Sequence, residues 1–179
     1  MIEYTVIVYE DGNKSWYLND ELHREDGPAC ECADGTKYWY LNGKRHREDG
    51  PAVEYSDGTK TWCLNGKLHR EDGPAIERAG GDKFWYLNGK RHREDGPACE
   101  YANGDKLWCL NGKLHREDGP AIEWANGTKS WFLNDIGMTE EEHQQQTNPA
   151  KELTVDPAKE LTVAEIEKLL GHKVKVVKG

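Results

Sequence analysis

Histidine, arginine, glutamate and aspartate stand side by side in this chain, in the heptapeptide His-Arg-Glu-Asp-Gly-Pro-Ala. The heptapeptide occurs five times unchanged, always 23 residues apart, at 23–29, 46–52, 69–75, 92–98 and 115–121. These residue types suit acid/base catalysis or a metal ladder. An active site is normally a single constellation, so five identical copies favour structural hydrogen bonding and indicate that the chain is no enzyme. We expect no catalytic residue, no metal ligand and no cofactor, with a metal ladder as the alternative.

Tryptophans follow the same 23-residue step, at Trp16, Trp39, Trp62, Trp85, Trp108 and Trp131. A fixed period of this size is typical of a repeat array, in which each unit packs mainly on its neighbours. Residues 37–82 and 83–128 differ at nine positions, so the middle units are two copies of a double unit. The sequence therefore predicts about six units over residues 1–135.

The turn before each tryptophan is predicted from an Asp-Gly pair or a variant of it, as at Asp57-Gly58. A two-residue type I′ hairpin there would place Glu54 opposite Thr61 and Val53 opposite Trp62. Residues that face each other across strands share one side of the sheet. This register therefore puts the tryptophans on the same side as Val53.

The turn after each tryptophan is predicted from an Asn-Gly pair, as at Asn42-Gly43, which would place Tyr40 opposite Arg45. In the alternate unit the same two positions hold Cys63 and Leu68. An aromatic residue thus occurs with arginine, and a small apolar residue with leucine, as cation–π and apolar packing would require. The same exchange separates Tyr86 and Arg91 from Cys109 and Leu114.

Two faces follow from these registers. The tryptophans, the histidines, the leucines two residues after each tryptophan, and the row Cys30, Val53, Ile76, Cys99 and Ile122 would form a buried structural face. The opposite face would carry regular glutamates and aromatic residues, which suit a protein partner with a basic surface or imitate a phosphate backbone. A solvated polar face is the alternative. The predicted partner-binding residues are Glu31, Tyr38, Tyr40, Arg45, Glu54, Glu77, Phe84, Tyr86, Arg91, Glu100, Glu123 and Phe132.

Composition narrows the function classes. The net charge is −9, which disfavours direct binding to nucleic acid or to an anionic membrane. Only 36% of the residues are hydrophobic and the mean hydropathy is −0.94, which suits a thin repeat sheet. No apolar run approaches a membrane span, and the first residues lack the pattern of a signal peptide. The five cysteines are not in C-x-x-C pairs, so we expect reduced structural thiols and a cytoplasmic protein.

The units resemble MORN repeats. The matching residues are Asn42-Gly-Lys-Arg-His46, Tyr55-Ser-Asp-Gly58 and Asn65-Gly-Lys67, and the resemblance covers about residues 4–135. Typical MORN units place glycines after the histidine, where this chain has Arg-Glu-Asp-Gly-Pro, so it is similar to a divergent variant. The resemblance implies a curved single-layer antiparallel sheet used as a binding scaffold, with protein-contacting, membrane-associated or antitoxin-like roles and no catalytic residue.

The tail differs in composition from the array. Residues 136–157 are predicted as a polar linker, with a short helix near Met138–Pro149, and 158–179 as a helix–strand element. An eight-residue tandem copy occupies 148–163, Thr162 and Glu165 form a capping box, and 172–178 alternates like an edge strand. This ending resembles the tails of small phage-encoded proteins. It would dock on the last repeat or join two copies of the chain as a homodimer.

The predicted fold class is an all-β repeat, an elongated and twisted single-layer antiparallel sheet of hairpins with a short C-terminal helix–strand element. The leading hypothesis for function is a non-enzymatic protein-binding scaffold, acting as a phage- or bacterium-encoded inhibitor or antitoxin-like factor in the (host) cytoplasm. Two alternatives remain, a small-molecule or nucleotide-binding sponge that uses aromatic stacking and a membrane-surface scaffold. Net charge disfavours both.

Overall fold

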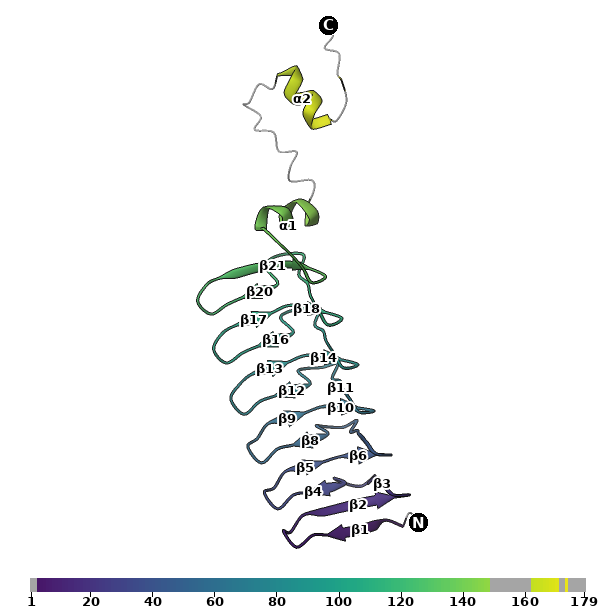
Figure 1. The fold of residues 1–179 in the computed structure, drawn as a ribbon. Helices are drawn as coiled ribbons and strands as arrows, with labels where there is room; N and C mark the ends of the chain where they lie inside the picture. Colours follow the sequence, from purple (N-terminus) through teal and green to yellow (C-terminus); the bar gives the residue numbers. More distant parts are fainter. Residues whose placement is uncertain (1–2, 149–161, 171–172, 174–179) are drawn as a thin grey trace. The chain divides into compact units, whose positions relative to one another are not determined.

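The computed structural model describes residues 3–148, 162–170 and 173 (Figure 1). The chain divides into two compact units, Met1–His143 and Gln144–Gly179. The first unit is a stack of antiparallel hairpins, as the sequence predicts, and the second contains the end of α1 (Glu140–Thr147) and the helix α2 (Val163–Leu170).

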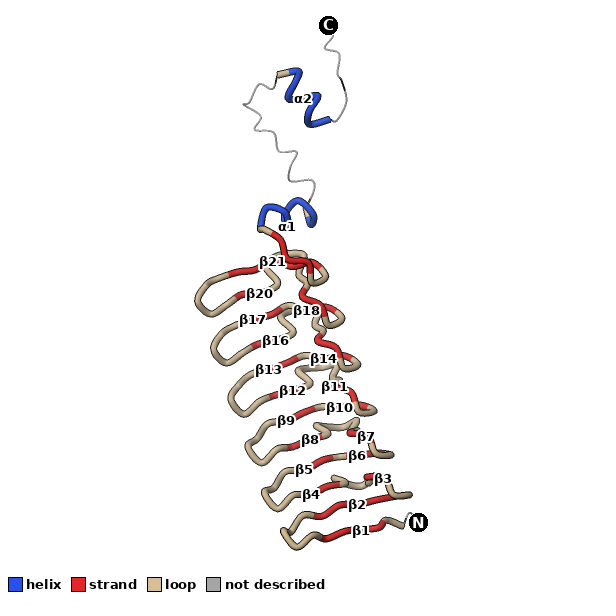
Figure 2. The backbone as a smooth tube through the Cα atoms, in the orientation of Figure 1, coloured by secondary structure: helices blue, strands red, loops and turns tan. Residues whose placement is uncertain are grey.

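One long antiparallel sheet runs through the stack in the order β1-β2-β4-β5-β8-β9-β12-β13-β16-β17-β20-β21-β22, with β3 (Glu21–Leu22) on the side of β2. Figure 2 shows these strands stacked along one side of the array. Their bounds are Thr5–Val8, Lys14–Leu18, Cys30–Glu31, Lys37–Tyr38, Val53–Glu54, Lys60–Thr61, Ile76–Glu77, Lys83–Phe84, Cys99–Glu100, Lys106–Leu107, Ile122–Glu123, Lys129–Leu133 and Ile136–Met138.

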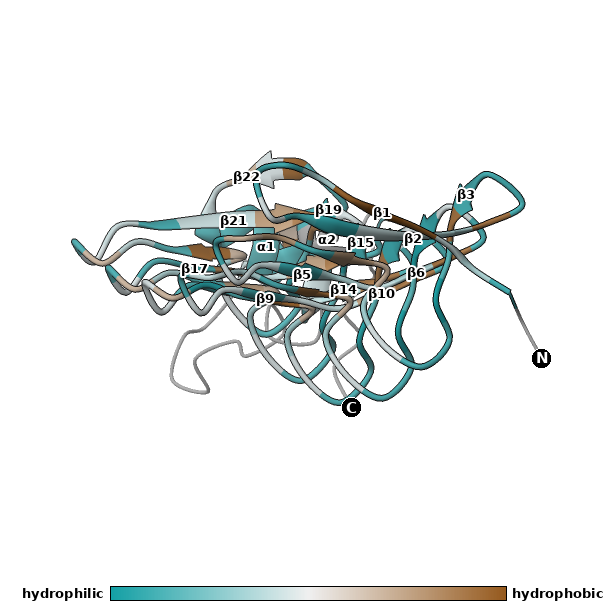
Figure 3. Ribbon diagram, turned by 90° about the horizontal axis from the view of Figure 1, so that it is seen from below, coloured by the Kyte–Doolittle hydropathy of each residue, from teal (hydrophilic) through white to brown (hydrophobic). Residues whose placement is uncertain are grey.

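A second set of short hairpins branches from the long sheet, one in each middle unit. They pair β6 (Tyr40–Leu41) with β7 (Lys44–Arg45), β10 (Cys63–Leu64) with β11 (Lys67–Leu68), β14 (Tyr86–Leu87) with β15 (Lys90–Arg91), and β18 (Cys109–Leu110) with β19 (Lys113–Leu114). Viewed along the stack, hydrophobic residues follow the strands and the projecting loops are hydrophilic (Figure 3).

Each tryptophan in the middle units lies between the long sheet and the short hairpin, and its backbone joins the two. The Trp39 amide donates to the Ala52 carbonyl at 2.9 Å, and the Trp39 carbonyl accepts from the His46 amide at 3.1 Å. One strand therefore changes its partner at the tryptophan, which explains why the sheet and the hairpins form separate ladders. The predicted opposition of tryptophan and histidine is confirmed.

The register around Asn42-Gly43 is the predicted one. Tyr40 lies opposite Arg45 and Cys63 opposite Leu68. Asn42 and Gly43 both have positive φ, 49° and 69°, as a type I′ turn requires. The equivalent pairs in the second double unit, Tyr86 with Arg91 and Cys109 with Leu114, are confirmed as well.

The register around Asp57-Gly58 differs from the prediction by one residue. Val53 lies opposite Thr61, and Glu54 opposite Lys60. Only Gly58 of this pair has positive φ, at 90°, while the Asp57 carboxylate accepts the Thr59 amide at 2.7 Å. This is a longer loop with a glycine bulge. The Gly80-Gly81 turn has the same register without a carboxylate at its first position, and there too only the second glycine has positive φ.

A one-residue slip exchanges the two faces of a strand. Val53 lies opposite Thr61 on one side and Tyr38 on the other. Its equivalent Cys99 lies opposite Phe84 and Leu107. We call this the inner face; it holds the buried Val53, Phe84 and Cys99. The prediction that tryptophans share the face of Val53 is wrong, because the arginine that stacks on each tryptophan binds a glutamate of the opposite, outer face.

The array extends beyond Asp135, where the sequence placed the start of a linker. Residues Ile136–Met138 form β22 against β21, and α1 (Glu140–Thr147) follows. Thr139 and Glu142 form a capping box at 2.8 and 3.2 Å. His143 is buried and its Nε2 lies 2.6 Å from the Arg116 carbonyl oxygen. The short predicted helix is therefore present, and its first turn is anchored to the last complete repeat.

The predicted capping box of α2 is present. The Glu165 carboxylate accepts the Thr162 amide at 2.8 Å, and the Thr162 hydroxyl accepts the Glu165 amide at 3.3 Å. Most of the tandem copy at 148–163 and of the strand predicted at 172–178 lies outside the described residues.

Candidate functional site: a row of tryptophan-lined clefts

The arginine of each heptapeptide fixes the bend that joins one unit to the next. Arg116 stacks on the Trp108 ring at 4.0 Å. Its Nε donates to Asp118 at 2.8 Å, and one terminal nitrogen donates to Glu123 at 2.9 Å and to the Pro120 carbonyl at 3.3 Å. The same contacts recur around Arg24, Arg47, Arg70 and Arg93. Arginine–carboxylate pairs therefore recur within each bend and not as a ladder between units.

The glycine of the heptapeptide is explained by the same arginine. A Cβ on Gly50 would lie 2.9 Å from the guanidinium carbon of Arg47, closer than real Cβ atoms approach. The arginine side chain thus crosses directly over the glycine. Glycine is needed here for space, because this position does not have positive φ.

The histidine of the heptapeptide connects consecutive units by a hydrogen bond. The Asn134 amide donates to Nδ1 of His115 at 3.2 Å, and Asn88 and Asn111 do the same to His69 and His92. A neutral ring that accepts at Nδ1 carries its proton on Nε2. In His115, Nε2 lies 3.6 Å from the Glu117 carboxylate. The predicted structural hydrogen bonding of the histidines is confirmed.

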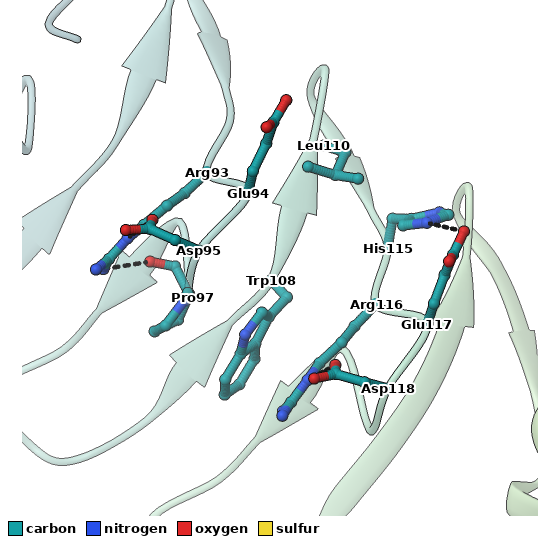
Figure 4. A pocket seen from close by; sticks show the side chains of 11 residues that line it. Arg93, Glu94, Asp95, Pro97, Trp108, Leu110, His115, Arg116, Glu117 and Asp118 are labelled. Carbon is teal, nitrogen blue, oxygen red and sulfur yellow. Dashed lines mark hydrogen bonds and ion pairs between the residues drawn. The ribbon is translucent and has the colours of Figure 1, made fainter.

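A cleft opens between each pair of consecutive bends. In Figure 4, Trp108 lies between the bend that holds Arg93 and Pro97 and the bend that holds Arg116. Leu110 and His115 complete the wall, and the acidic residues of both bends form the rim. Four such clefts have equivalent linings, with volumes of about 740, 730, 760 and 580 Å³. The array therefore repeats one site rather than building a single unique site.

The charges at the rim do not cancel. The guanidinium of each arginine is shared by an aspartate and a glutamate, and it lowers the pKa of Asp72 and of the equivalent aspartates. The first glutamate of the heptapeptide has the histidine two residues earlier beside it, at 3.7 Å for His69 and Glu71, and the Glu71 and Glu94 side chains are 85% and 84% exposed. Glu48, Glu71 and Glu94 each line two neighbouring clefts. A cleft thus presents two carboxylates that no arginine neutralises.

The predicted site glutamates lie elsewhere on the outer face, in a ladder with lysines. Glu54 is opposite both Lys37 and Lys60. The full order along the sheet is Lys14, Glu31, Lys37, Glu54, Lys60, Glu77, Lys83, Glu100, Lys106, Glu123 and Lys129. Each of these glutamates also accepts a hydrogen bond from a bend arginine, so they do not form the predicted row of free carboxylates.

The predicted site aromatics lie on the inner face, apart from the glutamates. Phe84 is 4% exposed and meets Tyr101 edge-on. Arg45 lies 5.4 Å above the Tyr38 ring and donates to the Tyr40 hydroxyl at 3.3 Å. Arg91 donates to Tyr86 in the same way, and Phe132 lies half-buried in β21. Arg45 therefore stacks on Tyr38 and not on Tyr40, which the sequence suggested as its cation–π partner. The predicted surface of glutamates and aromatic residues does not exist as one surface, because the two sets lie on opposite faces of the sheet.

The cleft residues were assigned to the buried face by the sequence interpretation, so the site itself was missed. A signal existed in the lysines, which follow the sheet glutamates by six residues in every unit, as Lys60 follows Glu54. Opposite charges favour directly facing positions across two strands. That pairing requires the longer loop and moves the tryptophans to the outer face.

No known family model matches the chain, and no curated protein matches it. Within residues 3–148, 162–170 and 173, no group of three or more histidine, cysteine or acidic side chains is placed to hold a metal ion. None of the helices in that part of the chain is long and apolar enough to cross a membrane.

Proposed function

We propose that this chain is a non-enzymatic repeat scaffold that binds a protein partner with a basic surface through the row of clefts. The observation that supports this most is the cleft with two carboxylates that no arginine binds, repeated four times with equivalent linings. An aromatic and aliphatic floor with a charged rim suits a protein side chain with an apolar stem and a cationic head. Identical neighbouring sites suit a target that offers the same group several times.

The arginines favour this proposal over the nucleotide-binding sponge. A phosphate ligand needs free arginines, lysines or amide groups. Arg70 is already bound to Asp72 and Glu77, and Arg45 and Arg91 lie among inner-face aromatics. The lysines of the long sheet alternate with glutamates. A membrane-surface role is likewise disfavoured by the net charge of −9.

The origin of the scaffold is a separate proposal. We propose that the units are divergent MORN-like repeats, since the period of 23 residues and the hairpin array agree with that resemblance. The biological setting that the tail suggests is an inhibitor or antitoxin-like factor in conflict between phage and bacterium. This setting is supported by resemblance alone.

Two triple variants with the same charge change test the proposed function. Glu48→Gln, Glu71→Gln and Glu94→Gln remove three rim charges. Asp11→Asn, Asp34→Asn and Asp57→Asn remove three charges at hairpin tips that line none of the described clefts. The tip changes preserve turn geometry, because Asn103 and Asn126 accept the same backbone hydrogen bond in later units.

Purified wild type and both triple variants are used to capture proteins from a bacterial lysate, with the complex mass measured by light scattering. We expect a stoichiometric protein complex with wild type and with the tip variant, and its loss with the rim variant. A Tyr40→Ala/Tyr86→Ala variant serves as the inner-face comparison. Loss of the complex only in that variant would move the site to the inner face, and a co-purifying nucleotide without a protein would refute the proposal.

A further inference from the structure

The spacing of the clefts restricts the partner further than its charge does. One unit adds two strands to the long sheet, as β8 and β9 are followed by β12 and β13. Neighbouring strands lie about 4.8 Å apart, so equivalent points of neighbouring clefts are separated by roughly 10 Å. A partner that fills several clefts must present equivalent groups at that step.

Each cleft suits one cationic side chain. The indole of Trp62 and the side chain of Leu64 provide an apolar wall for an alkyl stem, and Glu48 and Glu71 provide carboxylates for its head. Arg70 covers one face of the Trp62 indole at 4.1 Å, and Asp72, Glu77 and the Pro74 carbonyl hold its guanidinium there. The stem of the partner would therefore use the part of the wall that Arg70 leaves open. Lysine and arginine both combine an apolar stem with a permanent cation, which acidic, neutral or short side chains lack.

The backbone conformation of the partner follows from the same spacing of roughly 10 Å between neighbouring clefts. In a polyproline II helix, every third residue lies on the same side and advances about 9.3 Å, which matches the step. In an extended β-strand, successive third residues point to opposite sides, so only every second cleft would be reached. In an α-helix, about seven residues span the step, so a helix offers one cation in seven residues where a polyproline II segment offers one in three.

We propose that the clefts bind an extended polypeptide segment in a polyproline II conformation that carries lysine or arginine at every third position. This inference rests on the proposed function, because it specifies the partner of the same clefts. Rim glutamates shared between neighbouring clefts would then lie between successive cations, so each added cation gains from carboxylates on both sides.

Fluorescently labelled 15-residue peptides test the period directly, with binding measured by anisotropy. The first peptide is five copies of Pro-Pro-Lys, the second has the same composition with its five lysines contiguous, and the third is five copies of Pro-Pro-Gln. We expect the periodic peptide to bind at least about tenfold more tightly than the contiguous one, since its lysines can reach all four clefts, whereas a contiguous run offers at most two lysines in step. The glutamine peptide should not bind.

The matched triple variants then locate the site. Binding of the periodic peptide should weaken at least about tenfold in Glu48→Gln/Glu71→Gln/Glu94→Gln, and less than about threefold in Asp11→Asn/Asp34→Asn/Asp57→Asn. Equal weakening in both variants would mean long-range attraction without a defined site. Equal binding of the periodic and contiguous peptides, or no binding of either, would overturn the periodic partner. The proposed function would still be decided independently by the lysate capture.

Discussion

The outer face of the array is nearly the same in every unit, whereas the inner face alternates from one unit to the next. Outer contacts connect units, since each histidine binds the asparagine of the following turn and each arginine closes the bend between strands. An altered residue there would disturb two units at once. Inner contacts can be exchanged in local pairs, as Tyr40 with Arg45 replaces Cys63 with Leu68. Uniformity on one face and variation on the other thus have different physical causes.

The largest effect is expected from a buried aromatic of the inner face. Phe84→Ala removes a ring that is 4% exposed and packs against Cys99 and Tyr101. The free energy of unfolding should fall by about 3–4 kcal/mol, measured by urea denaturation. Trp124→Ala is the matched control, because Trp124 is 42% exposed and should cost less than about 1 kcal/mol. Similar losses in the two variants would show that the inner face does not provide the main hydrophobic stabilisation.

A smaller loss is expected from the outer face, where polar contacts are partly exposed. Arg70→Ala removes the stack on Trp62 and the bonds to Asp72 and Glu77. We expect a loss of about 2 kcal/mol in the free energy of unfolding. Arg70→Lys keeps the charge but lacks the planar fork that reaches both carboxylates, so it should recover less than half. Full recovery with lysine would show that only the positive charge at position 70 stabilises the bend.

The alternation of the inner face can be tested by converting one unit into the other type. Leu68→Arg alone puts a guanidinium opposite a thiol, and Cys63→Tyr alone adds volume, so each should destabilise by about 2 kcal/mol. The double variant recreates the pair seen at Tyr40 and Arg45. A double-mutant cycle of urea unfolding should give a favourable coupling of about 1 kcal/mol. If the losses of the two single variants simply add in the double variant, the tyrosine and the arginine do not stabilise each other.

The sequence predicted the strand register correctly at one type of turn and incorrectly at the other. Asn42-Gly43 could be predicted because both residues tolerate positive φ and the type I′ turn fixes the register. Asp57-Gly58 looks equivalent in the sequence, yet only Gly58 has positive φ and the loop is one residue longer, as it also is at Gly80-Gly81. Since side chains alternate along a strand, that single residue of difference exchanged the two faces.

The long-range contacts were beyond the sequence for a different reason. The capping box of Thr162 and Glu165 is local and could be predicted. The contact of His143 with the Arg116 carbonyl joins residues 27 positions apart, and it exists only because β22 directs α1 back to the last repeat. No local pattern around His143 signals that partner. The cleft site depends likewise on which face the bends occupy.

The smallest effect is expected from the pH dependence of a single bend. Arg70 lowers the pKa of the Asp72 carboxyl below its ordinary value of 3.8. A carboxyl with a lower pKa in the folded state stabilises the fold above its unfolded pKa, and this contribution is lost as the pH falls through the folded value. The urea midpoint of the wild type should therefore be nearly constant from about pH 7 to 5 and fall below about pH 4.

Asp72→Asn should be less stable than wild type at pH 7, and the two midpoints should converge near pH 2, because protonation then removes the same charge from the wild type. The two proteins differ only at residue 72, so the difference between the two curves isolates the aspartate. A difference that stays constant down to pH 2 would show that Asp72 acts through its shape alone and that the charge of the bend contributes nothing to the uniform outer face.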